Sequence, residues 1–403
     1  MPEFRHVPDE DREAFHSLVS YAFRPEDGPF DDFDPEDLPA GATVGTRYGL
    51  YDGDDDLLAA CKHIDFRTRL RGDVHDLHGL SAVASPPERR RRGLVGQMLH
   101  ESLVQSRSEG VYLSALWPFK RSFYGQYGWA TATRAVEHDL DPDALSFAPD
   151  HDHGEFVPLD VDDDWERTAA VHDAHGAGYE LTMERSEEWW RKRVFAGWED
   201  DPYAYGFERE DGDLAAYLTY SVEGDGDEKT LQVRDWAAVD HDARLAVLRF
   251  LADHDSQVDR VHVWTPADAD LLDHLPNTDD VEATVRLCPM ARLVDVGAAL
   301  GALSYPDGAD CELVVAVSDS FADWNDDTYR LSVAGGAATV ERGADPAAAD
   351  VELDVGALSQ LYVGYRSASD LAAVGDVDAA GERALDALAD CFPERPTFLR
   401  EGF

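Results

Sequence analysis

Four consecutive arginines stand directly before a predicted helix. They occupy Arg89–Arg92 within the stretch Ser81–Gly96, in which a strand ends at Ser85, two prolines follow and a helix begins at Gly93. A helix N-terminus carries about half a positive charge, so cations there are unfavourable by a few tenths of a kcal/mol each. The arrangement becomes favourable when an anion binds to the arginines and to the free N–H groups of residues 91–96.

The arginines have a second interpretation, as a solvated cluster that offsets neighbouring carboxylates. An Arg-x-x-Gly pattern alone is weak, but the order strand, proline, Arg-x-x-Gly, helix is considerably more specific. Gly93 and Gly96 would also let the backbone approach a bound anion closely. The sequence therefore predicts a binding site for a small polyanion at residues 91–96.

Composition argues against most other anionic partners. The 403 residues include 35 Lys plus Arg and 83 Asp plus Glu, for a net charge of −48, and only Lys62, Lys120, Lys192 and Lys229 are lysines. Dispersed carboxylates with so little lysine are typical of proteins that work in molar salt, where the Debye length is about 3 Å. An ordinary acidic cytosolic protein is the alternative. Nucleic acid and anionic membrane are excluded as general partners, because both bind basic patches.

The remaining chemical signals are weak. Cys61, Cys288, Cys311 and Cys391 show no CxxC spacing, so we expect isolated buried thiols in a reducing compartment. No signal peptide and no apolar run of membrane-spanning length occur, which predicts a soluble cytoplasmic protein. Histidines such as His151 and His153 lack companion ligands at metal-site spacing, so no metal is expected.

The predicted elements repeat along the chain. A helix (9–22), three strands (42–50, 57–66, 77–84), a helix (93–108) and a strand (111–117) are followed by the same order in 151–295. The last hundred residues predict a strand meander with two helices. We therefore expect an α+β protein with domains at 1–150, 151–295 and 296–403, of which the second copies the first.

These segments resemble a known family. Residues 90–95, Arg-Arg-Arg-Gly-Leu-Val, are similar to motif A of the GNAT acetyltransferases, a Gln/Arg-x-x-Gly-x-Gly/Ala loop that binds the pyrophosphate of acetyl-coenzyme A; the final Val is a mild departure. The whole chain resembles the enhanced-intracellular-survival (Eis) branch, in tandem GNAT-like domains followed by a sterol-carrier-protein-like α+β domain. Stretches 122–130 and 290–296 also resemble that branch, and the composition suggests a haloarchaeal-type member.

The resemblance implies a cofactor site. The backbone of Val83, Ala84 and Ser85 would polarise the acetyl carbonyl and bind the pantetheine arm. The segment Arg91, Arg92, Gly93, Leu94, Val95 and Gly96 would hold the pyrophosphate, and Phe119 and Lys120 would flank the cofactor. The cofactor is acetyl-CoA as a co-substrate, without a metal.

The resemblance also implies two catalytic residues. The C-terminal carboxylate of Phe403 would act as the base that deprotonates the amine, and Tyr124 would be the general acid for the coenzyme A thiolate. A thiol pKa of about 8.5 lies below that of tyrosine, so this transfer is uphill by about 2 kcal/mol unless the site lowers the tyrosine pKa. The alternatives are a frayed terminus and a tyrosine that only packs.

Two other regions of the chain relate to this scheme in different ways. The matching turn of the second copy, residues 238–244, has no glycine and two aspartates, so it would repel a pyrophosphate and is predicted to be structural. Phe23, Glu26, Asp27 and Phe33 could line the acceptor cleft, although a solvated loop is equally consistent with them.

Together these observations predict an acetyl-CoA-dependent N-acetyltransferase. It would transfer the acetyl group to a primary amine of a small polycationic or lysine-like acceptor by direct attack in a ternary complex. The resemblance implies a homo-hexamer, a trimer of dimers. The alternative is a non-catalytic acetyl-CoA sensor or a carrier of a lipid or other apolar ligand.

Overall fold

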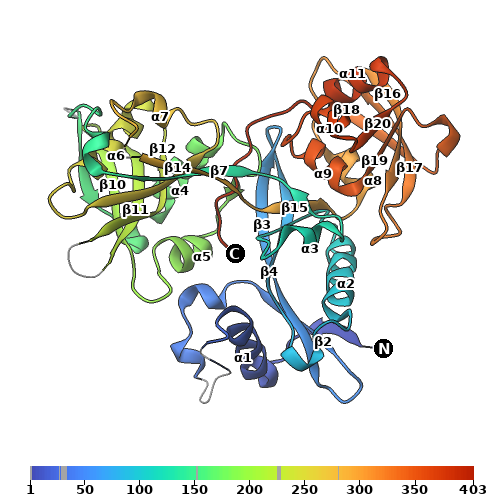
Figure 1. The fold of residues 1–403 in the computed structure, drawn as a ribbon, viewed down its shortest axis with the longest axis horizontal. Coiled ribbons are helices and arrows are strands. Elements are labelled where there is room, and N and C mark those ends of the chain that lie inside the picture. The colour runs from blue at the N-terminus through green and yellow to red at the C-terminus, as the bar shows by residue number, and fades with distance from the viewer. Residues whose placement is uncertain (1, 27, 29–33, 151–152, 225–227, 280) are drawn as a thin grey trace. The chain divides into compact units, whose positions relative to one another are not determined.

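A computed structural model describes residues 2–26, 28, 34–150, 153–224, 228–279 and 281–403. The chain forms two compact units, which are drawn in Figure 1. Unit 1 comprises residues 1–37, 45–133 and 288–403, and unit 2 comprises residues 38–44 and 134–287. Each unit is described separately.

The first sheet of unit 1 carries the predicted cofactor segment. Its strands run in the order β1-β2-β3-β4-β5-β15-β6. Their bounds are β1 (Glu3–His6), β2 (Thr46–Tyr51), β3 (Leu57–Leu70), β4 (Asp73–Ala84), β5 (Leu113–Leu116), β6 (Ala130–Thr131) and β15 (Met290–Leu293). The first half of β3 is buried on both faces, and from Asp65 onward exposed and buried residues alternate, as expected where a strand leaves the core.

Helices cover both faces of this sheet. α2 (Leu94–Ser108) buries Met98, Leu99 and Leu103, which recur at helical spacing, and Figure 1 shows it beside the long β3–β4 hairpin. α1 (Arg12–Phe23) buries Phe15 completely against Ala60 and Val7. A short helix, α3 (Arg121–Gly125), follows β5 and carries Tyr124.

Unit 1 also contains the C-terminal module, residues 296–403. Its five-stranded sheet has the order β18-β17-β16-β19-β20. Its elements are α8 (Val296–Ala302), β16 (Cys311–Ser318), β17 (Asp327–Ala334), β18 (Ala337–Arg342), β19 (Val351–Asp354), α9 (Val355–Tyr362), α10 (Ala368–Val374), β20 (Val377–Ala379) and α11 (Glu382–Cys391). The tip of the β3–β4 hairpin meets this module, where Arg71 Nη1 donates to the Cys391 carbonyl at 3.1 Å.

Unit 2 is built on a seven-stranded sheet in the order β14-β7-β13-β12-β11-β10-β8. Its strands are β7 (Arg134–Leu140), β8 (Gly154–Pro158), β9 (Met183–Glu184, outside this sheet), β10 (Tyr203–Arg209), β11 (Leu214–Glu223), β12 (Thr230–Ala238), β13 (Arg260–Pro266) and β14 (Val281–Leu287). Its helices are α4 (Val161–Gly176), α5 (Glu187–Trp189), α6 (His241–Ala252) and α7 (Leu271–His274). The core lies between this sheet and α6.

Two strands change the expected division of the chain. β7 follows the first GNAT-like segment in sequence but pairs with β13 and β14 of unit 2. β15, at the end of the second segment, pairs with β5 and β6 in the first sheet of unit 1. The domain ranges 1–150, 151–295 and 296–403 stay a prediction, whereas strand pairing passes from one unit to the other at residues 133–134 and 287–288.

The prediction of isolated cysteines is wrong for one pair. The Sγ atoms of Cys311 and Cys391 lie 2.7 Å apart, because the start of β16 meets the end of α11. Burial raises the pKa of the Cys61 and Cys391 thiols, so neither is a ready nucleophile at neutral pH. Among the described residues, no helix combines the length and apolarity needed to cross a membrane.

Candidate functional site

A β-bulge interrupts β4 at the predicted cofactor segment. Ala60 pairs with Ala84 and Lys62 pairs with Ser81, so β4 has one residue more than β3 between these pairs. Ala82 takes up the extra length with a φ of +52°. Such a bulge bends the strand and ends regular pairing, so Val83, Ala84 and Ser85 leave the sheet in a new direction.

β4 also separates from its other neighbour. It pairs in parallel with β5 at His78–Ser114 and Gly79–Ala115, and β4 then continues to Ala84 without a further paired residue in the described part of β5. The backbone groups of β4 that face this side have no strand partner beyond Gly79. An unpaired edge of this kind can hydrogen-bond an extended ligand.

The helix after this edge begins without a side-chain cap. Gly93 is the N-cap of α2, with a φ of +79°, and has no side chain to accept from the first amides. The first intrahelical bond runs from the Gln97 N–H to the Gly93 carbonyl at 2.9 Å. The amides of Leu94, Val95 and Gly96 are therefore available to an anion.

The four arginines divide into two groups. Arg89 forms ion pairs with Asp56 at 2.9 Å and Asp52 at 3.4 Å, and these bonds raise its pKa. Arg90, Arg91 and Arg92 are exposed and form no ion pair within the described ranges. The interpretation as a cluster that offsets carboxylates thus holds for Arg89, whereas the other three guanidinium groups are free to bind an anion.

Gly96 also has a packing role, besides the predicted close approach to an anion. A Cβ at this position would lie 2.9 Å from the Tyr127 hydroxyl. The residue is small because a tyrosine ring packs against the first turn of α2. Close approach by a ligand is therefore not the only reason for this glycine.

Tyr124 lies deep in the core on the α2 side of the first sheet. Its side chain is 3% exposed and belongs to the same core cluster as Cys61, Leu80 and Met98. Burial, and then the nearby Cys61, raise the pKa of the phenol. Proton transfer to a thiolate would be easier if the site lowered the pKa of Tyr124, so the shift has the opposite direction. The hydroxyl forms no hydrogen bond with another described residue, so it is free to donate to a ligand.

Phe119 and Lys120 lie in the loop between β5 and α3. Phe119 is 73% exposed, and its ring stands 5.6 Å from that of Tyr124 in an edge-on arrangement. Lys120 is exposed and precedes α3 as its N-cap. An aromatic ring exposed beside a buried tyrosine is consistent with a binding surface.

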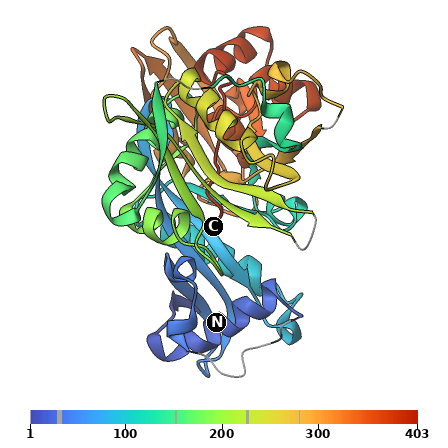
Figure 2. The same ribbon diagram turned by 90° about the vertical axis from the view of Figure 1, so that its left-hand side faces the viewer.

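The C-terminal tail is docked on the first sheet. Thr133 Oγ1 donates to the Thr397 carbonyl at 3.0 Å, and Trp117 Nε1 donates to the Glu401 carbonyl at 2.6 Å. Phe398 and Leu399 are buried between these two anchors. Figure 2 shows the end of the chain against the blue strands of this sheet. The tail is thus held by unit 1 and is not frayed.

Phe403 lies over Gly79, where β4 and β5 begin to separate. Its ring centroid is 5.0 Å from that of Phe66, and a Cβ on Gly79 would approach the Phe66 ring to 2.6 Å and the Phe403 ring to 3.0 Å. Since Gly79 and Phe66 face away from α2, Phe403 and Tyr124 lie on opposite faces of the sheet. The structure brings the carboxylate-bearing residue to the edge of the β4–β5 opening.

Sequence reasoning missed Gly79 and Trp117. A glycine inside a strand often marks close approach by another segment, so Gly79 carried a usable signal. Trp117 carried none, because its partner is a backbone carbonyl 284 positions away.

Unit 2 has the corresponding layout, but its helix start is capped by a side chain. β12 pairs in parallel with β13 at residues 230–232 and carries a bulge at Arg234. Its next helix, α6, is capped by Asp240, whose carboxylate accepts from the Ala243 amide at 3.0 Å and pairs with Arg209. The helix start is already occupied by a carboxylate, which supports a structural role for this copy.

The structure describes the proposed acceptor loop only in part. Phe23 and Glu26 are exposed, whereas Asp27, Phe33 and His151 lie outside the described residues. Among the residues that are described, no group of three or more His, Cys, Asp or Glu side chains has metal-binding geometry.

Comparison with known proteins agrees with this layout. Residues 3–132 and 181–293 each match an acetyltransferase (GNAT) domain family, and residues 296–400 match a sterol carrier protein domain family. The chain has the fold of a GCN5-related N-acetyltransferase from Anabaena variabilis, with a TM-score of 0.84 at 20% identity over 100% of both chains. The protein is an N-acetyltransferase of the GNAT type, and hence an enzyme rather than a non-catalytic sensor or carrier.

Two curated relatives indicate which acetyltransferases the whole chain resembles. The chain is 29% identical over 373 residues to an uncharacterized N-acetyltransferase of Streptomyces avermitilis, covering 88% of each. It is 28% identical over 370 residues to the N-acetyltransferase Eis of Mycobacterium tuberculosis, covering 87% of each. The structure of Eis1 from Mycobacterium abscessus shares the fold, with a TM-score of 0.76 at 22% identity over 100% of both chains. These proteins support the predicted resemblance to the Eis branch.

Proposed function

We propose that unit 1 transfers an acetyl group from acetyl-CoA to a primary amine of a small polycationic or lysine-like acceptor. The observation that carries this proposal is the uncapped start of α2, with the unpaired Arg90–Arg92 beside it and the unpaired edge of β4 before it. Enzymes of this type take the acetyl group from acetyl-CoA. These features fit the two parts of that molecule, an extended amide-containing arm and a pyrophosphate.

The proposed cofactor contacts follow from this fit. The amides of residues 94–96 and the guanidinium groups of Arg91 and Arg92 would bind the pyrophosphate. The edge of β4 at Val83–Ser85 would hydrogen-bond the pantetheine arm, as an added strand does. Phe119 and Lys120 would cover the arm from the loop before α3.

The proposed chemistry is direct acyl transfer. The acceptor amine loses a proton to the carboxylate of Phe403, its nitrogen forms an amide bond with the acetyl carbon, and the C–S bond breaks. Tyr124 donates a hydrogen bond from its hydroxyl to the departing sulfur, and the proton taken up by the carboxylate of Phe403 passes through solvent to that sulfur, so the products are the amide and the free thiol. The docked tail and the free hydroxyl of Tyr124 support these two assignments.

The cellular setting is proposed from composition and resemblance. The net charge of −48 with four lysines supports a halophilic, haloarchaeal-type enzyme that works in the cytoplasm at molar salt. The homo-hexamer, a trimer of dimers, is proposed from the resemblance to the Eis branch. Screening by salt would allow carboxylate-rich surfaces to meet at such interfaces.

An amine screen tests the proposed function. The full chain is incubated with acetyl-CoA and a panel of polyamines, aminoglycosides and lysine peptides in molar KCl, and free thiol is measured. We expect amine-dependent thiol release and a product heavier by one acetyl group. Hydrolysis of acetyl-CoA at the same rate with every amine and with none would contradict the proposal.

Neutralising Arg90, Arg91 and Arg92 together is expected to weaken acetyl-CoA binding. A triple glutamine variant should raise the KM for acetyl-CoA by roughly 10- to 100-fold, because charge-assisted bonds to the phosphates are lost. The change in kcat should be small. The matched control is Arg89→Gln, since Arg89 is already paired with Asp52 and Asp56. Equal KM changes in the two proteins would contradict the assignment.

A further inference from the structure

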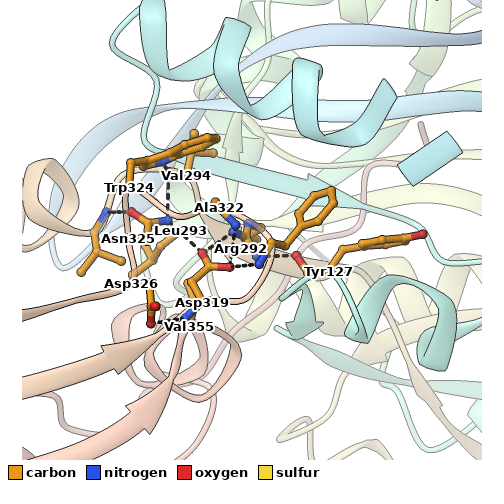
Figure 3. A network of polar contacts seen from close by, with 12 residues as sticks. Tyr127, Arg292, Leu293, Val294, Asp319, Ala322, Trp324, Asn325, Asp326 and Val355 are labelled. Carbon is orange, nitrogen blue, oxygen red and sulfur yellow. Dashed lines mark hydrogen bonds and ion pairs between the residues drawn. The ribbon is translucent and has the colours of Figure 1, made fainter. Parts of the chain in front are cut away.

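A fully buried ion pair joins the two modules of unit 1. Arg292 lies on β15 of the first sheet, and Asp319 follows β16 of the C-terminal module. Their side chains are 0% and 1% exposed, and Arg292 Nη2 donates to Asp319 Oδ2 at 2.5 Å. Figure 3 shows the pair at the centre of a polar network. The proposed mechanism does not use either residue.

Arg292 contacts the turn that follows Tyr124. Its Nη1 donates to the Tyr127 carbonyl, and its guanidinium lies 5.5 Å from the centre of the Trp129 ring. That ring is 6.4 Å from the ring of Tyr124. The turn fits closely around the arginine, because a Cβ on Gly128 would lie 1.7 Å from Nη1.

The same turn is tied back to Tyr124. The amides of Tyr127 and Trp129 both donate to the Tyr124 carbonyl, at 3.0 and 3.3 Å. The backbone of Tyr124 is therefore bonded to a turn whose outer carbonyl is held by Arg292. A shift of the guanidinium would move this turn and the tyrosine together.

Asp319 is itself rigidly held. Its Oδ1 accepts from the amides of Phe321 and Ala322, at 3.1 and 3.0 Å, and its Oδ2 also accepts from Asn325 Nδ2 at 3.1 Å. Asn325 bonds the backbone on either side of Asp295, at the Val294 carbonyl and the Val296 amide. The carboxylate therefore presents a fixed anchor to Arg292 (Figure 3).

The loop around Asp319 also touches α2. The Phe321 ring lies 4.6 Å from that of Tyr127 and 5.7 Å from that of His100 on α2. The C-terminal module thus contacts the helix of the proposed pyrophosphate site and the turn of the proposed acid through one short segment.

Stability alone does not account for this pair. Burial of two charges costs about as much as their attraction returns, and well-packed apolar replacements are often equally stable. The Nε of Arg292 is buried with no acceptor among the described residues, and burial lowers the pKa of the guanidinium. What an apolar pair could not supply is the directed bond to the Tyr127 carbonyl.

We propose that Arg292, fixed by Asp319, is a positioning residue for acetyl transfer, which holds the Tyr127–Trp129 turn and thereby aims the hydroxyl of Tyr124. This inference rests on the proposed role of Tyr124 as the general acid. It gives the C-terminal module a second part in catalysis, besides delivery of the terminal carboxylate.

The test replaces the pair by apolar residues of similar size. The single variants Arg292→Met and Asp319→Leu each leave a buried charge unpaired, so both should lower the Tm strongly. The double variant should have a higher Tm than either single variant, although below that of the parent because the amides of Phe321 and Ala322 lose their acceptor, and a KM for acetyl-CoA within threefold of the parent value. Its kcat should remain at least 10-fold lower than that of the parent. Recovery of both Tm and kcat would show that the pair is only structural.

A double-mutant cycle separates this inference from the assignment of Tyr124. If the pair acts through the tyrosine, the apolar double variant should lower kcat by less than threefold in a Tyr124→Phe background. An equal loss in both backgrounds would overturn the positioning role. Full activity of Tyr124→Phe alone would instead overturn the proposed acid.

Two further variants of the chain complete the test of this proposal. Arg292→Lys keeps a charge beside Asp319 but has a single ammonium, which cannot span both the carboxylate and the Tyr127 carbonyl as the guanidinium does. We expect Arg292→Lys to fold and to have a lower kcat than the parent. A parental kcat in this variant would overturn the proposal, even if the apolar double variant failed to fold. The control is Arg342→Gln with Asp327→Asn, an accessible pair on β17 and β18, which should leave kcat unchanged.

Discussion

Two residues added after Phe403 are expected to abolish most acetyl transfer while acetyl-CoA still binds. Extension by Gly-Ser replaces the terminal carboxylate by a neutral amide and moves the new carboxylate by up to about 7 Å. Loss of a positioned base typically lowers rates by about 10²- to 10⁴-fold. We expect kcat to fall within that range and the KM for acetyl-CoA to change by less than threefold, as measured by thiol release in molar KCl.

The fold should tolerate this extension. The anchors of the tail, at the carbonyls of Thr397 and Glu401, precede the added residues. Phe398 and Leu399 supply the buried contacts, whereas Gly402 is exposed. The Tm should therefore stay within a few degrees of the parent value. A fall in kcat without a fall in Tm would locate the effect at the terminus itself.

A matched variant separates the carboxylate from the ring. Phe403→Leu keeps the terminal carboxylate but reduces packing against Phe66 and Gly79. We expect it to retain much more activity than the extended chain. Parental kcat in the extended chain would show that the base lies elsewhere.

The sequence predicted the parts of the site that are local. The proline-arginine-glycine order located the start of α2 within one residue, because N-terminal signals lie next to the helix they begin. The sequence did not show that Arg89 forms ion pairs and differs in this from Arg90–Arg92. Asp52 and Asp56, the partners of Arg89, come from the β2–β3 turn, and such a pairing has no signature near the arginines.

Non-local strand pairing was the main feature of the fold that could not be predicted from the sequence. Residues 290–293 resembled a stretch of the Eis branch, yet nothing in them showed that they form β15 in the first sheet. A four-residue strand that is buried throughout has no alternation of buried and exposed residues, so its pattern does not identify it as a strand. The roles of Arg292 and of β7 depend on these pairings, so the sequence could not assign them.

The second copy differs from the first at the start of one helix. The bulged strand and the parallel pair are present in unit 2, but Asp240 caps α6 where Gly93 leaves α2 uncapped. Here the sequence interpretation and the structure agree, since an acidic residue before a helix is a strong capping signal. The capped helix start has no free amide left for a phosphate at Ala243.

The second large prediction concerns the hydroxyl of Tyr124, whose side chain is buried. Tyr124→Phe should lower kcat by roughly 10²-fold or more with little change in the KM for acetyl-CoA, since general acids contribute about 10²- to 10⁴-fold. Because burial raises the phenol pKa above its ordinary value of about 10, the group stays neutral below that pH. The parent enzyme should therefore show no loss of kcat from ionisation of Tyr124 up to about pH 10.

The raised pKa of the Tyr124 phenol also limits how far its proton can be transferred to the departing sulfur. Complete transfer of its proton to a free thiolate, with a pKa of about 8.5, would be uphill by more than about 2 kcal/mol, so we expect a hydrogen bond that strengthens as the C–S bond breaks. Tyr362→Phe is the control, because it removes a buried hydroxyl bonded to the Ala299 carbonyl in the C-terminal module; it should lower Tm but leave kcat unchanged. If the parent loses kcat above pH 8 to 9 and Tyr124→Phe does not, the phenol ionises there and its assignment as a neutral donor is wrong.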